Sequence, residues 1–417
     1  MANKHELWEL KQMQSMPLQA KIQMTRQRIR GWIDEFGEDG VYVSFSGGKD
    51  STVLLDIVRK DYPSIEAVFV NTGLEYPSVR QFALSKENVT ELRPTMNFRD
   101  VIIKYGYPII GKEVSQVVQE ARIGLKRGDG SYQFRIDRIM GAGHYKPLED
   151  GTKSQFDVSA YKFLLDAPFE ISDRCCKVMK KNPARNYERK TKRKIILATM
   201  AGESRLRRQR WLKYGCNAWD DKKQQSSNPM SFWTEQDVLT YIHTYNLAIA
   251  DAYGQVVVKN DGIDGQINIH DYLGDYRDCQ YETTGCKRTG CIFCGFGITQ
   301  DKQRFVRLSE QEPKLCDYVM RGGEFFYKVF DKNGAEIKLR HCSHKKIEKW
   351  CIDNVDNSNF KITSTWQPSK DGLGYWFVLE WLNVHGKLKI GIPNREHYLS
   401  EYQTEEAEKY LRNEVAK

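Results

Sequence analysis

The segment that most constrains the fold is a glycine-rich turn between a short apolar run and a helical pattern. The run at residues 41–43 precedes Ser-Phe-Ser-Gly-Gly-Lys-Asp-Ser-Thr at 44–52, and a helix-like apolar pattern follows at 53–58. A strand, a turn and a helix in this order point backbone N–H groups and a helix N-terminus toward a bound anion. The alternative is an ordinary strand-to-helix connection. We expect a phosphate-binding loop, although not a Walker loop, because Gly-x-x-x-x-Gly-Lys-Ser/Thr is absent.

Length and composition describe a globular protein rather than a membrane or secreted one. The 417 residues, 40% hydrophobic and 29% charged, are enough for two or three domains. No apolar run approaches the roughly 20 residues that a membrane span needs, and the first eight residues lack the apolar core of a secretion signal. We therefore expect a cytoplasmic protein without membrane contact, whose cysteines are reduced or bound to metal.

Positive charge is concentrated in one segment. The net charge is +9, but residues 174–213 hold 15 Lys and Arg against two acids, so this segment carries +13 and the remainder −4. Such a block can bind the phosphates of a nucleic acid, the phosphates of a nucleotide or a sulfate-like anion. A solvated surface helix is the alternative. The neighbouring turns described below favour a phosphate-lined site.

The order of strands and helices predicts an α/β fold. Residues 1–38 have helical spacing, and a strand–helix–strand pattern follows at Val41–Phe45, Ser51–Lys60 and Ala67–Val70. Further strands are expected to end near Leu92 and Ala198. This alternation predicts a parallel, twisted sheet with helices on both faces, and ligands in such sheets bind beyond the carboxyl ends of the strands. The phosphate loop, a turn at Asn71 and a turn at Gly202 all fall there.

Shifts in composition suggest four segments. They are an N-terminal helical segment at 1–38, a nucleotide-binding domain at 39–260 with an insertion at 122–170, a cysteine-rich segment at 261–319, and a small α+β region at 320–417. In the last, Asn333-Gly334 between two apolar runs predicts a hairpin. Upstream, Thr234 and Asp237 have the spacing of a helix N-cap and its capping box. The aromatic residues expected in cores are Trp8, Trp32, Trp366, Tyr375, Trp376 and Trp381, and the aliphatic contacts of the N-terminal helix are Leu10, Ile22 and Ile29.

Five segments occur in an order that resembles a known family. They are the phosphate loop, Asn-Thr-Gly-Leu-Glu-Tyr-Pro at 71–77, the Cys175-Cys176 pair, Gly-Glu-Ser-Arg at 202–205 and Phe-Trp-Thr-Glu-Gln-Asp-Val at 232–238. Together they resemble the phosphoadenosine phosphosulfate (PAPS) reductase family, and the loop resembles the PP-loop, Ser-Gly-Gly-x-Asp-Ser, of the ATP pyrophosphatases. The likeness spans residues 38–310 and is closer to the branch with the PP-loop component of DNA phosphorothioation systems. It implies an adenine nucleotide α-hydrolase-like fold and cleavage of ATP between the α and β phosphates.

The resemblance assigns roles to residues at matching positions. The residues implied to hold the nucleotide phosphates are Ser44, Ser46, Gly47, Gly48, Lys49, Asp50, Ser51 and Thr52, of which Lys49, Asp50 and Ser51 would be catalytic. Asn71, Thr72 and Gly73 would flank the adenosine, and Glu203 and Arg205 would lie near the phosphate or sulfate end. Lys177, Arg207 and Arg208 are weaker candidates for anion contacts. Asp50 is expected to help hold Mg²⁺ with the phosphate oxygens.

Two departures separate this sequence from reductases that act on adenylyl sulfates. Those enzymes carry a nucleophilic cysteine in a short motif near the C-terminus, whereas the last cysteine here, Cys351, stands in Lys-Trp-Cys-Ile-Asp. Their phosphate loop is usually degenerate, whereas this one is intact. Both departures favour an enzyme that consumes ATP.

A second cysteine cluster predicts a metal site. Cys286, Cys291 and Cys294 are spaced Cys-x4-Cys-x2-Cys, and a zinc ion or an iron–sulfur cluster needs a fourth ligand. Assimilatory adenylyl sulfate reductases pair a Cys-Cys with a distant Cys-x-x-Cys around a [4Fe–4S] cluster. The resemblance thus implies a cluster held by Cys176, Cys286, Cys291 and Cys294, with Cys175 as an alternate ligand, or by Cys175, Cys176, Cys291 and Cys294. Zinc, whose site His341 or His344 could complete, and reduced cysteines without metal are the alternatives. Cys216, Cys316 and Cys351 are expected in cores.

The leading functional hypothesis joins these features. ATP and Mg²⁺ adenylylate a substrate, DNA or tRNA, and sulfur from a persulfide, a cluster-bound sulfide or a donor protein such as a cysteine desulfurase then displaces AMP. One alternative is an iron–sulfur (phospho)adenylyl sulfate reductase. Another is a defence component that binds ATP and nucleic acid without turnover.

Overall fold

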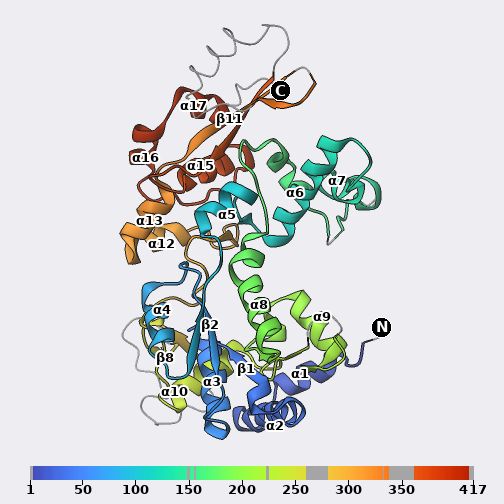
Figure 1. Ribbon diagram of the computed structural model, residues 1–417, viewed down its shortest axis with the longest axis vertical. Coiled ribbons are helices and arrows are strands. Elements are labelled where there is room, and N and C mark those ends of the chain that lie inside the picture. Colours follow the sequence, from blue (N-terminus) through green and yellow to red (C-terminus); the bar gives the residue numbers. More distant parts are fainter. Residues whose placement is uncertain are drawn as a thin grey trace. The chain divides into compact units, whose positions relative to one another are not determined.

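The computed structural model describes residues 3–147, 151–154, 156–221, 225–259, 280–331, 333–337 and 361–412. The chain forms two compact units, which are called here the sheet unit and the aromatic unit (Figure 1). The sheet unit contains residues 1–95 and 179–292, and the aromatic unit contains residues 96–178 and 293–417. Each unit therefore collects two distant stretches of chain, unlike the four consecutive segments expected from composition.

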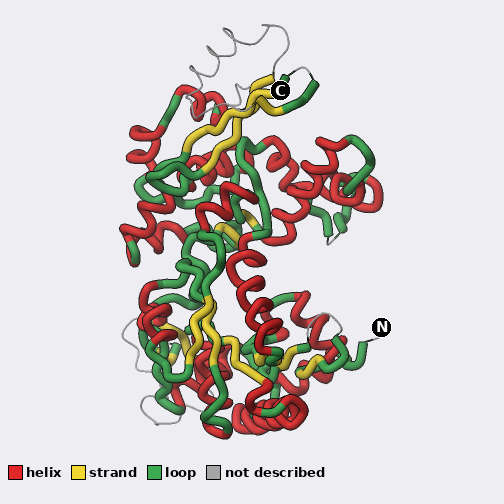
Figure 2. Tube along the Cα trace, viewed as in Figure 1, coloured by secondary structure: helices red, strands yellow, loops and turns green. Residues whose placement is uncertain are grey.

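The sheet unit is built on a six-stranded sheet with the strand order β3-β2-β1-β5-β7-β6 (Figure 2). The strands are β1 (Val41–Ser44), β2 (Ala67–Val70), β3 (Val89–Leu92), β5 (Lys194–Ile196), β6 (Asn217–Ala218) and β7 (Ser226–Ser227). All neighbours are parallel except β6 and β7. The predicted α/β fold with a mainly parallel sheet is confirmed.

Helices cover both faces of this sheet because its strands are apolar on both sides. Val41 and Val43 of β1 join a large core with α2 (Leu18–Phe36), α3 (Lys49–Asp61) and α10 (Glu235–Thr244). Tyr42 points the other way, into a smaller cluster with Tyr187 of α8 (Asn182–Thr191). Alternate strand residues face opposite sides of a sheet, so the continuous apolar run of β1 requires helices on both.

Shorter elements complete the sheet unit. They are α1 (Leu7–Gln14), α4 (Pro77–Leu84), α9 (Arg205–Tyr214), β8 (Val256–Val258) and β9 (Tyr281–Thr283). The capping box of α10 is confirmed, since the Asp237 N–H donates to Thr234 Oγ1 and the Thr234 N–H donates to Asp237 Oδ2. The N-terminal helices form as predicted, but Trp8 is 61% exposed rather than in the core. It lies on the outer side of α1, whose only buried residue is Leu10.

The aromatic unit combines helices with a small antiparallel sheet. Its helices are α5 (Phe98–Tyr105), α6 (Lys112–Arg127), α7 (Gln133–Met140), α12 (Arg304–Gln311), α13 (Pro313–Met320), α15 (Tyr375–Gly386), α16 (Arg395–Tyr402) and α17 (Glu405–Leu411). Its strands are β4 (Ile109–Ile110), β10 (Gly295–Phe296), β11 (Glu324–Phe330), β12 (Glu336–Ile337) and β13 (Lys361–Gln367). Strand β11 pairs antiparallel with β12, which confirms the hairpin predicted around Gly334. In the part of the chain that the structure describes, no helix is both long and apolar enough to cross a membrane.

Aromatic rings packed edge to face form much of the core of the aromatic unit. Tyr107 packs edge-on against Tyr375 with ring centroids 5.2 Å apart, and Trp366 packs against Trp376 at 5.7 Å. The predicted burial of Trp366, Tyr375, Trp376 and Trp381 is confirmed. Because Tyr107 and Tyr375 come from distant stretches, residues 361–412 share a core with residues 96–178 and do not form a separate module.

Candidate phosphate-binding site

The phosphate loop connects β1 to α3 at the carboxyl edge of the sheet. Gly47 has φ +71°, and a Cβ there would lie 2.7 Å from the carbonyl oxygen of Val79 in α4. Only glycine fits this combination of left-handed backbone and close approach. Gly48 is the N-cap of α3, so the helix N-terminus begins at Lys49. The shape of this turn is thus determined locally, by its two glycines.

The loop hydroxyls stabilise the loop itself. Ser51 Oγ donates to the Gly48 carbonyl at 2.9 Å and accepts from the Ser46 N–H at 3.2 Å. Ser46 Oγ lies 3.0 Å from Ser51 Oγ and accepts from the Gly48 N–H at 3.3 Å. Thr52 Oγ1 also donates to the Gly48 carbonyl, at 3.0 Å. The structure therefore brings the predicted Ser46, Gly47, Gly48 and Ser51 together. The hydroxyls of Ser51 and Thr52 are hydrogen-bonded to the backbone of the loop.

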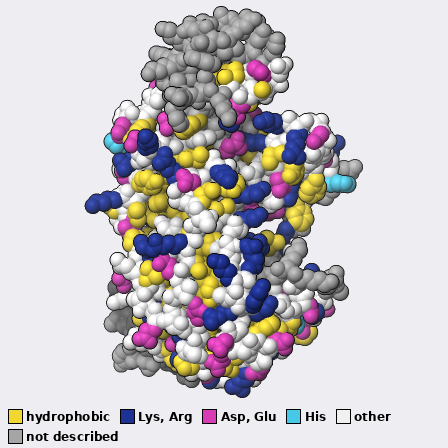
Figure 3. All heavy atoms as spheres, viewed as in Figure 1, with side chains coloured by type: hydrophobic (Ala, Val, Ile, Leu, Met, Phe, Trp, Pro, Cys, Tyr) yellow, Lys and Arg dark blue, Asp and Glu magenta, His cyan; other side chains and the backbone are white. Residues whose placement is uncertain are grey.

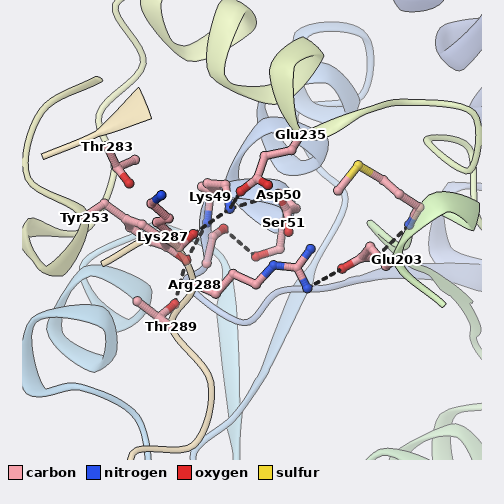
Figure 4. Close-up of polar contacts among 12 residues, drawn as sticks. Lys49, Asp50, Ser51, Glu203, Glu235, Tyr253, Thr283, Lys287, Arg288 and Thr289 are labelled. Atoms are coloured by element: carbon pink, nitrogen blue, oxygen red, sulfur yellow. Dashed lines mark hydrogen bonds and ion pairs between the residues drawn. The ribbon is translucent and has the colours of Figure 1, made fainter. Parts of the chain in front are cut away.

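Lys49 is held by two acceptors and is only 3% exposed. Its ammonium donates to the Lys287 carbonyl at 2.9 Å and lies 3.1 Å from Glu235 Oε1 at the start of α10 (Figure 4). A buried ammonium without partners would be costly, so these contacts explain why Lys49 tolerates its position. A phosphate that binds Lys49 has to compete with Glu235.

Asp50 presents an oxygen that the protein does not use. Its Oδ1 is buried without a hydrogen-bond donor and lies 3.9 Å from the Lys49 ammonium. Burial raises the pKa of this carboxyl, with a further contribution from Glu235, while Lys49, Arg288 and Arg207 oppose the rise. A carboxylate oxygen without a donor, next to a phosphate loop, fits the ligand set that Mg²⁺ shares with phosphates.

The segment between Cys286 and Cys291 forms one side of this site, which the sequence did not predict. Besides the Lys287 carbonyl, Thr289 Oγ1 lies 2.5 Å from the Tyr253 hydroxyl, which accepts from the Lys49 N–H at 3.2 Å. Figure 4 shows Tyr253, Thr289 and Lys49 converging from three separate elements. The sequence signal for this role is the basic pair Lys287-Arg288 inside the cysteine motif.

The turn after β2 is braced by its own side chains. Asn71 donates from Nδ2 to Glu91 at 2.5 Å and accepts the Gly73 N–H at 3.0 Å. Thr72 Oγ1 donates to Glu75 at 2.8 Å, and Gly73 has φ +72°. The predicted residues of this turn lie together. Their side-chain hydrogen bonds stabilise the turn and connect it to Glu91 of β3.

Glu203 connects two arginines near the loop. It forms ion pairs with Arg207, in α9, and with Arg288, whose Nη1 lies 3.8 Å from Oε1. Burial and the charge of Arg288 lower the pKa of Arg207, whereas the charge of Asp50 raises it, so the three charged groups interact electrostatically. Arg205 is exposed at the start of α9. The acid at position 203 thus neutralises an anion-binding cluster whose second arginine was not predicted.

A cavity of about 340 Å³ lies beside the loop, large enough for a nucleoside moiety. Its lining residues are Ser44, Phe45, Ser46, Phe69, Val70, Glu75, Tyr76, Val79, Lys180, Lys181, Ala184, Arg185, Ile195, Leu197, Thr289 and Gly290. Most apolar members come from the strands or the residues next to them, and Val79 and Ala184 come from α4 and α8. The basic members come from α8 and from the π-helix Lys177–Lys181 before it. Asn71, Thr72 and Gly73 are not among the lining residues.

The predicted metal ligands are divided between the two units. Cys286 and Cys291 belong to the sheet unit, and Cys175, Cys176 and Cys294 belong to the aromatic unit. Within the aromatic unit the Cys175 and Cys176 sulfurs are 3.9 Å apart. Burial raises the pKa of Tyr375, and Cys294, Tyr107 and Cys175 add to the rise.

The metal site therefore stays a prediction. Among the described residues, no group of three or more His, Cys, Asp or Glu is arranged to hold a metal ion. The core positions of Cys216 and Cys316 are confirmed, and burial raises the pKa of the Cys316 thiol to about 12. Cys351 and the candidate zinc ligands His341 and His344 lie outside the described residues.

Comparison with known proteins found one family model and a group of solved structures. Residues 40–112 match the model of the phosphoadenosine phosphosulfate reductase domain. Among solved structures, the phosphate complex of phosphoadenylyl-sulfate (PAPS) reductase from Candida auris aligns with 12% identity and a TM-score of 0.31, over 64% of this chain and 99% of that one. No curated protein matches the sequence significantly.

Proposed function

Because residues 40–112 match the model of the phosphoadenosine phosphosulfate reductase domain and contain an intact phosphate loop, we propose that this chain is a PP-loop enzyme that cleaves ATP to AMP and pyrophosphate. The AMP is transferred to a substrate, which is thereby activated for sulfur transfer or another nucleic-acid modification. The observation that carries the proposal is the intact loop. Lys49 and Asp50 stand at the N-terminus of α3, beside the 340 Å³ cavity.

The residues around the loop supply electrostatic stabilisation. As the bond between the α and β phosphates breaks, negative charge develops on the pyrophosphate. The Lys49 ammonium, with the N–H groups at the start of α3, offsets this charge in a partly buried site. Arg207 and Arg288 extend the positive field on the Glu203 side. Binding proceeds with transfer of Lys49 from Glu235 to a phosphate.

Asp50 supports a cation. Its unpartnered Oδ1 would hold Mg²⁺ together with phosphate oxygens, and the ion would supply further charge neutralisation on the pyrophosphate. In this arrangement Asp50 is a positioning carboxylate, and its burial keeps it directed at the loop.

The thiolates are proposed to hold a [4Fe–4S] cluster, with zinc as the alternative metal. Cysteine thiolates are the usual ligands of both. A cluster would supply redox or sulfur-carrying chemistry next to the activated substrate. The residues proposed as ligands are Cys176, Cys286, Cys291 and Cys294, with Cys175 as the alternate. The acceptor would be DNA or tRNA, and the sulfur would come from a donor such as a cysteine desulfurase.

The test follows α-labelled ATP with anaerobically purified protein, Mg²⁺ and single-stranded DNA or tRNA. Pyrophosphate and a labelled, adenylylated acceptor are the expected products, and addition of a sulfur donor should then release the label as AMP. Lys49→Met should lower the rate about 10²- to 10³-fold, the usual loss when one charge-stabilising donor is removed. Lys60→Met is the matched control, because Lys60 lies at the other end of α3, where it contacts Asp56 and Tyr241.

The outcomes separate the rival functions. Absence of cleavage between the α and β phosphates with every acceptor, while ATP still binds, would favour the binding component without turnover. The match to a reductase domain supports one further candidate, the reduction of an adenylyl sulfate. Release of sulfite from an adenylyl sulfate with a thiol donor, without any need for ATP, would establish that reaction in place of the first.

A further inference from the structure

A second, wider depression of about 1340 Å³ runs along α8 on the sheet unit and is called here the α8 groove. Its lining residues are Thr95, Asn182, Arg185, Asn186, Glu188, Arg189, Lys192, Arg193, Lys194, Trp219, Asp220, Asp221 and Gln225. It collects side chains from α8, the turn into β5, and the region around β6. Figure 3 shows Lys and Arg side chains gathered over α8.

The groove is lined by more basic side chains than acidic ones, and each of the acids already contacts another residue. Glu188 accepts from the Tyr42 hydroxyl at 3.0 Å, Asp220 pairs with Lys4 at 2.5 Å, and Asp221 pairs with Arg210 at 2.6 Å. Arg189 and Lys192 are exposed. Arg193 pairs with Glu66, but the charges of Arg189 and Lys192 face solvent here, where they can attract a polyanion.

The groove also offers an aromatic surface and amide groups. Trp219 is 37% exposed, and one side of its ring packs on Trp32, with centroids 4.6 Å apart. This packing fixes the indole while part of it stays accessible to a ligand. Asn182 and Gln225 add donors and acceptors. Basic side chains beside a fixed aromatic ring are the combination by which proteins bind single strands, through phosphate contacts and base stacking.

The groove and the nucleotide cavity share one lining residue. Arg185, on α8, lines both the 340 Å³ cavity and the groove. The ten residues of α8 span about 15 Å at 1.5 Å per residue, and its turn into β5 extends the basic surface through Lys192 to Lys194. A strand that follows α8 therefore reaches the cavity where ATP is proposed to bind.

We propose that the α8 groove binds single-stranded nucleic acid and leads it to the nucleotide cavity. The role as a substrate path rests on the proposed function, but the binding itself does not require ATP. Arg189 and Lys192 contact phosphates, and Trp219 stacks on a base. A duplex cannot offer its bases to Trp219 without unpairing, so single strands are preferred.

The experiment measures fluorescence anisotropy of labelled 15-nucleotide single-stranded DNA, the RNA of the same sequence and the DNA duplex, with the full chain and without ATP. Affinity is measured between 50 and 200 mM NaCl for Arg189→Gln/Lys192→Gln. The matched control is Lys190→Gln/Lys213→Gln, which removes the same charge from the same basic segment at positions that do not line the groove. Melting temperatures verify that both variants fold.

The groove variant should bind the single strand about 25-fold more weakly at 100 mM salt, since each phosphate contact contributes about fivefold there, and its salt slope should fall by about 1.4. The control should change less than threefold. Trp219→Leu should weaken single-strand binding about fivefold or more without changing the slope. DNA and RNA arms tell which strand is preferred.

Three results would overturn the proposal. They are no single-strand binding at 50 mM salt, equal losses in the groove and control variants, and duplex binding as tight as single-strand binding with no effect of Trp219→Leu. Because ATP is absent throughout, failure here is distinct from failure of ATP cleavage, which is measured by pyrophosphate release.

Discussion

Glu235→Gln should tighten ATP binding, because Glu235 competes with phosphate for Lys49. In the structure the Lys49 ammonium lies 3.1 Å from Glu235 Oε1 and 2.9 Å from the Lys287 carbonyl. The substitution keeps the length and the N-terminal position of the side chain in α10 but removes its charge. To bind a phosphate, Lys49 in this variant leaves a neutral amide instead of a carboxylate.

The magnitude follows from the exposure of the pair. At 3.1 Å, two unit charges attract by about 1.3 kcal/mol in a water-like dielectric and by about 5 kcal/mol at an effective dielectric of about 20. The Glu235 side chain is 44% exposed, so the water-like limit applies, and measured exposed pairs give up to about 1 kcal/mol. We therefore expect a dissociation constant for ATP lower by about fivefold.

The assay is titration calorimetry with ATP in EDTA, so that any contact between Glu235 and Mg²⁺ does not enter. Glu87→Gln is the control, because it makes the same change in net charge at an exposed position that acts on Arg59 instead of Lys49. Equal tightening in both variants would attribute the effect to the overall field. Weaker binding by Glu235→Gln would refute competition and indicate that Glu235 positions Lys49 for the phosphate.

Three further predictions concern the same site. Burial raises the pKa of Asp50, so the protein loses stability as pH rises from the ordinary aspartate value of about 3.9 through the raised one. Asp50→Asn should flatten this pH dependence of the melting temperature and abolish Mg²⁺-dependent turnover. An unchanged pH dependence in the variant would contradict the prediction. Tyr253→Phe removes the hydroxyl shared by Lys49 and Thr289, so we expect a loss of about 1 kcal/mol in unfolding free energy and a higher KM for ATP, neither of which Tyr245→Phe should show. Cys286→Ala/Cys291→Ala should lower iron and sulfide in anaerobic protein, whereas the buried Cys316→Ala should not; equal metal content in both would refute the ligand assignment.

The parts of the fold that sequence predicted are those with local causes. Apolar residues on both sides of β1 require helices on both faces, and the two glycines after it define the loop. The capping box of α10 depends on two residues three apart, Thr234 and Asp237. Such features depend on neighbours in the chain, and each formed where it was expected.

The parts that sequence missed depend on contacts between distant segments. Tyr253 and Glu235 reach Lys49 across about two hundred residues. Tyr253 lies in no motif, and the 232–238 segment that contains Glu235 indicated a family resemblance but no contact with Lys49. Trp8 stands two positions before Leu10, about 200° around the helix, so a helix that buries Leu10 directs Trp8 outward. Division of the chain into two units follows from the shared aromatic core of Tyr107 and Tyr375, which no local pattern encodes.

The cysteine motif and the phosphate loop, separate in the sequence, are joined in the structure by the four residues between Cys286 and Cys291. Within that stretch the Lys287 carbonyl holds the Lys49 ammonium, and Thr289 holds the Tyr253 hydroxyl. A ligand on the two flanking thiols would restrict the backbone of this stretch and hence the position of Lys49. Linkage then requires the reverse effect, so that a nucleotide bound at Lys49 changes the affinity of the thiols for their ligand by the same factor. The spacing of the cysteines is therefore a constraint on the phosphate site as well as on a metal.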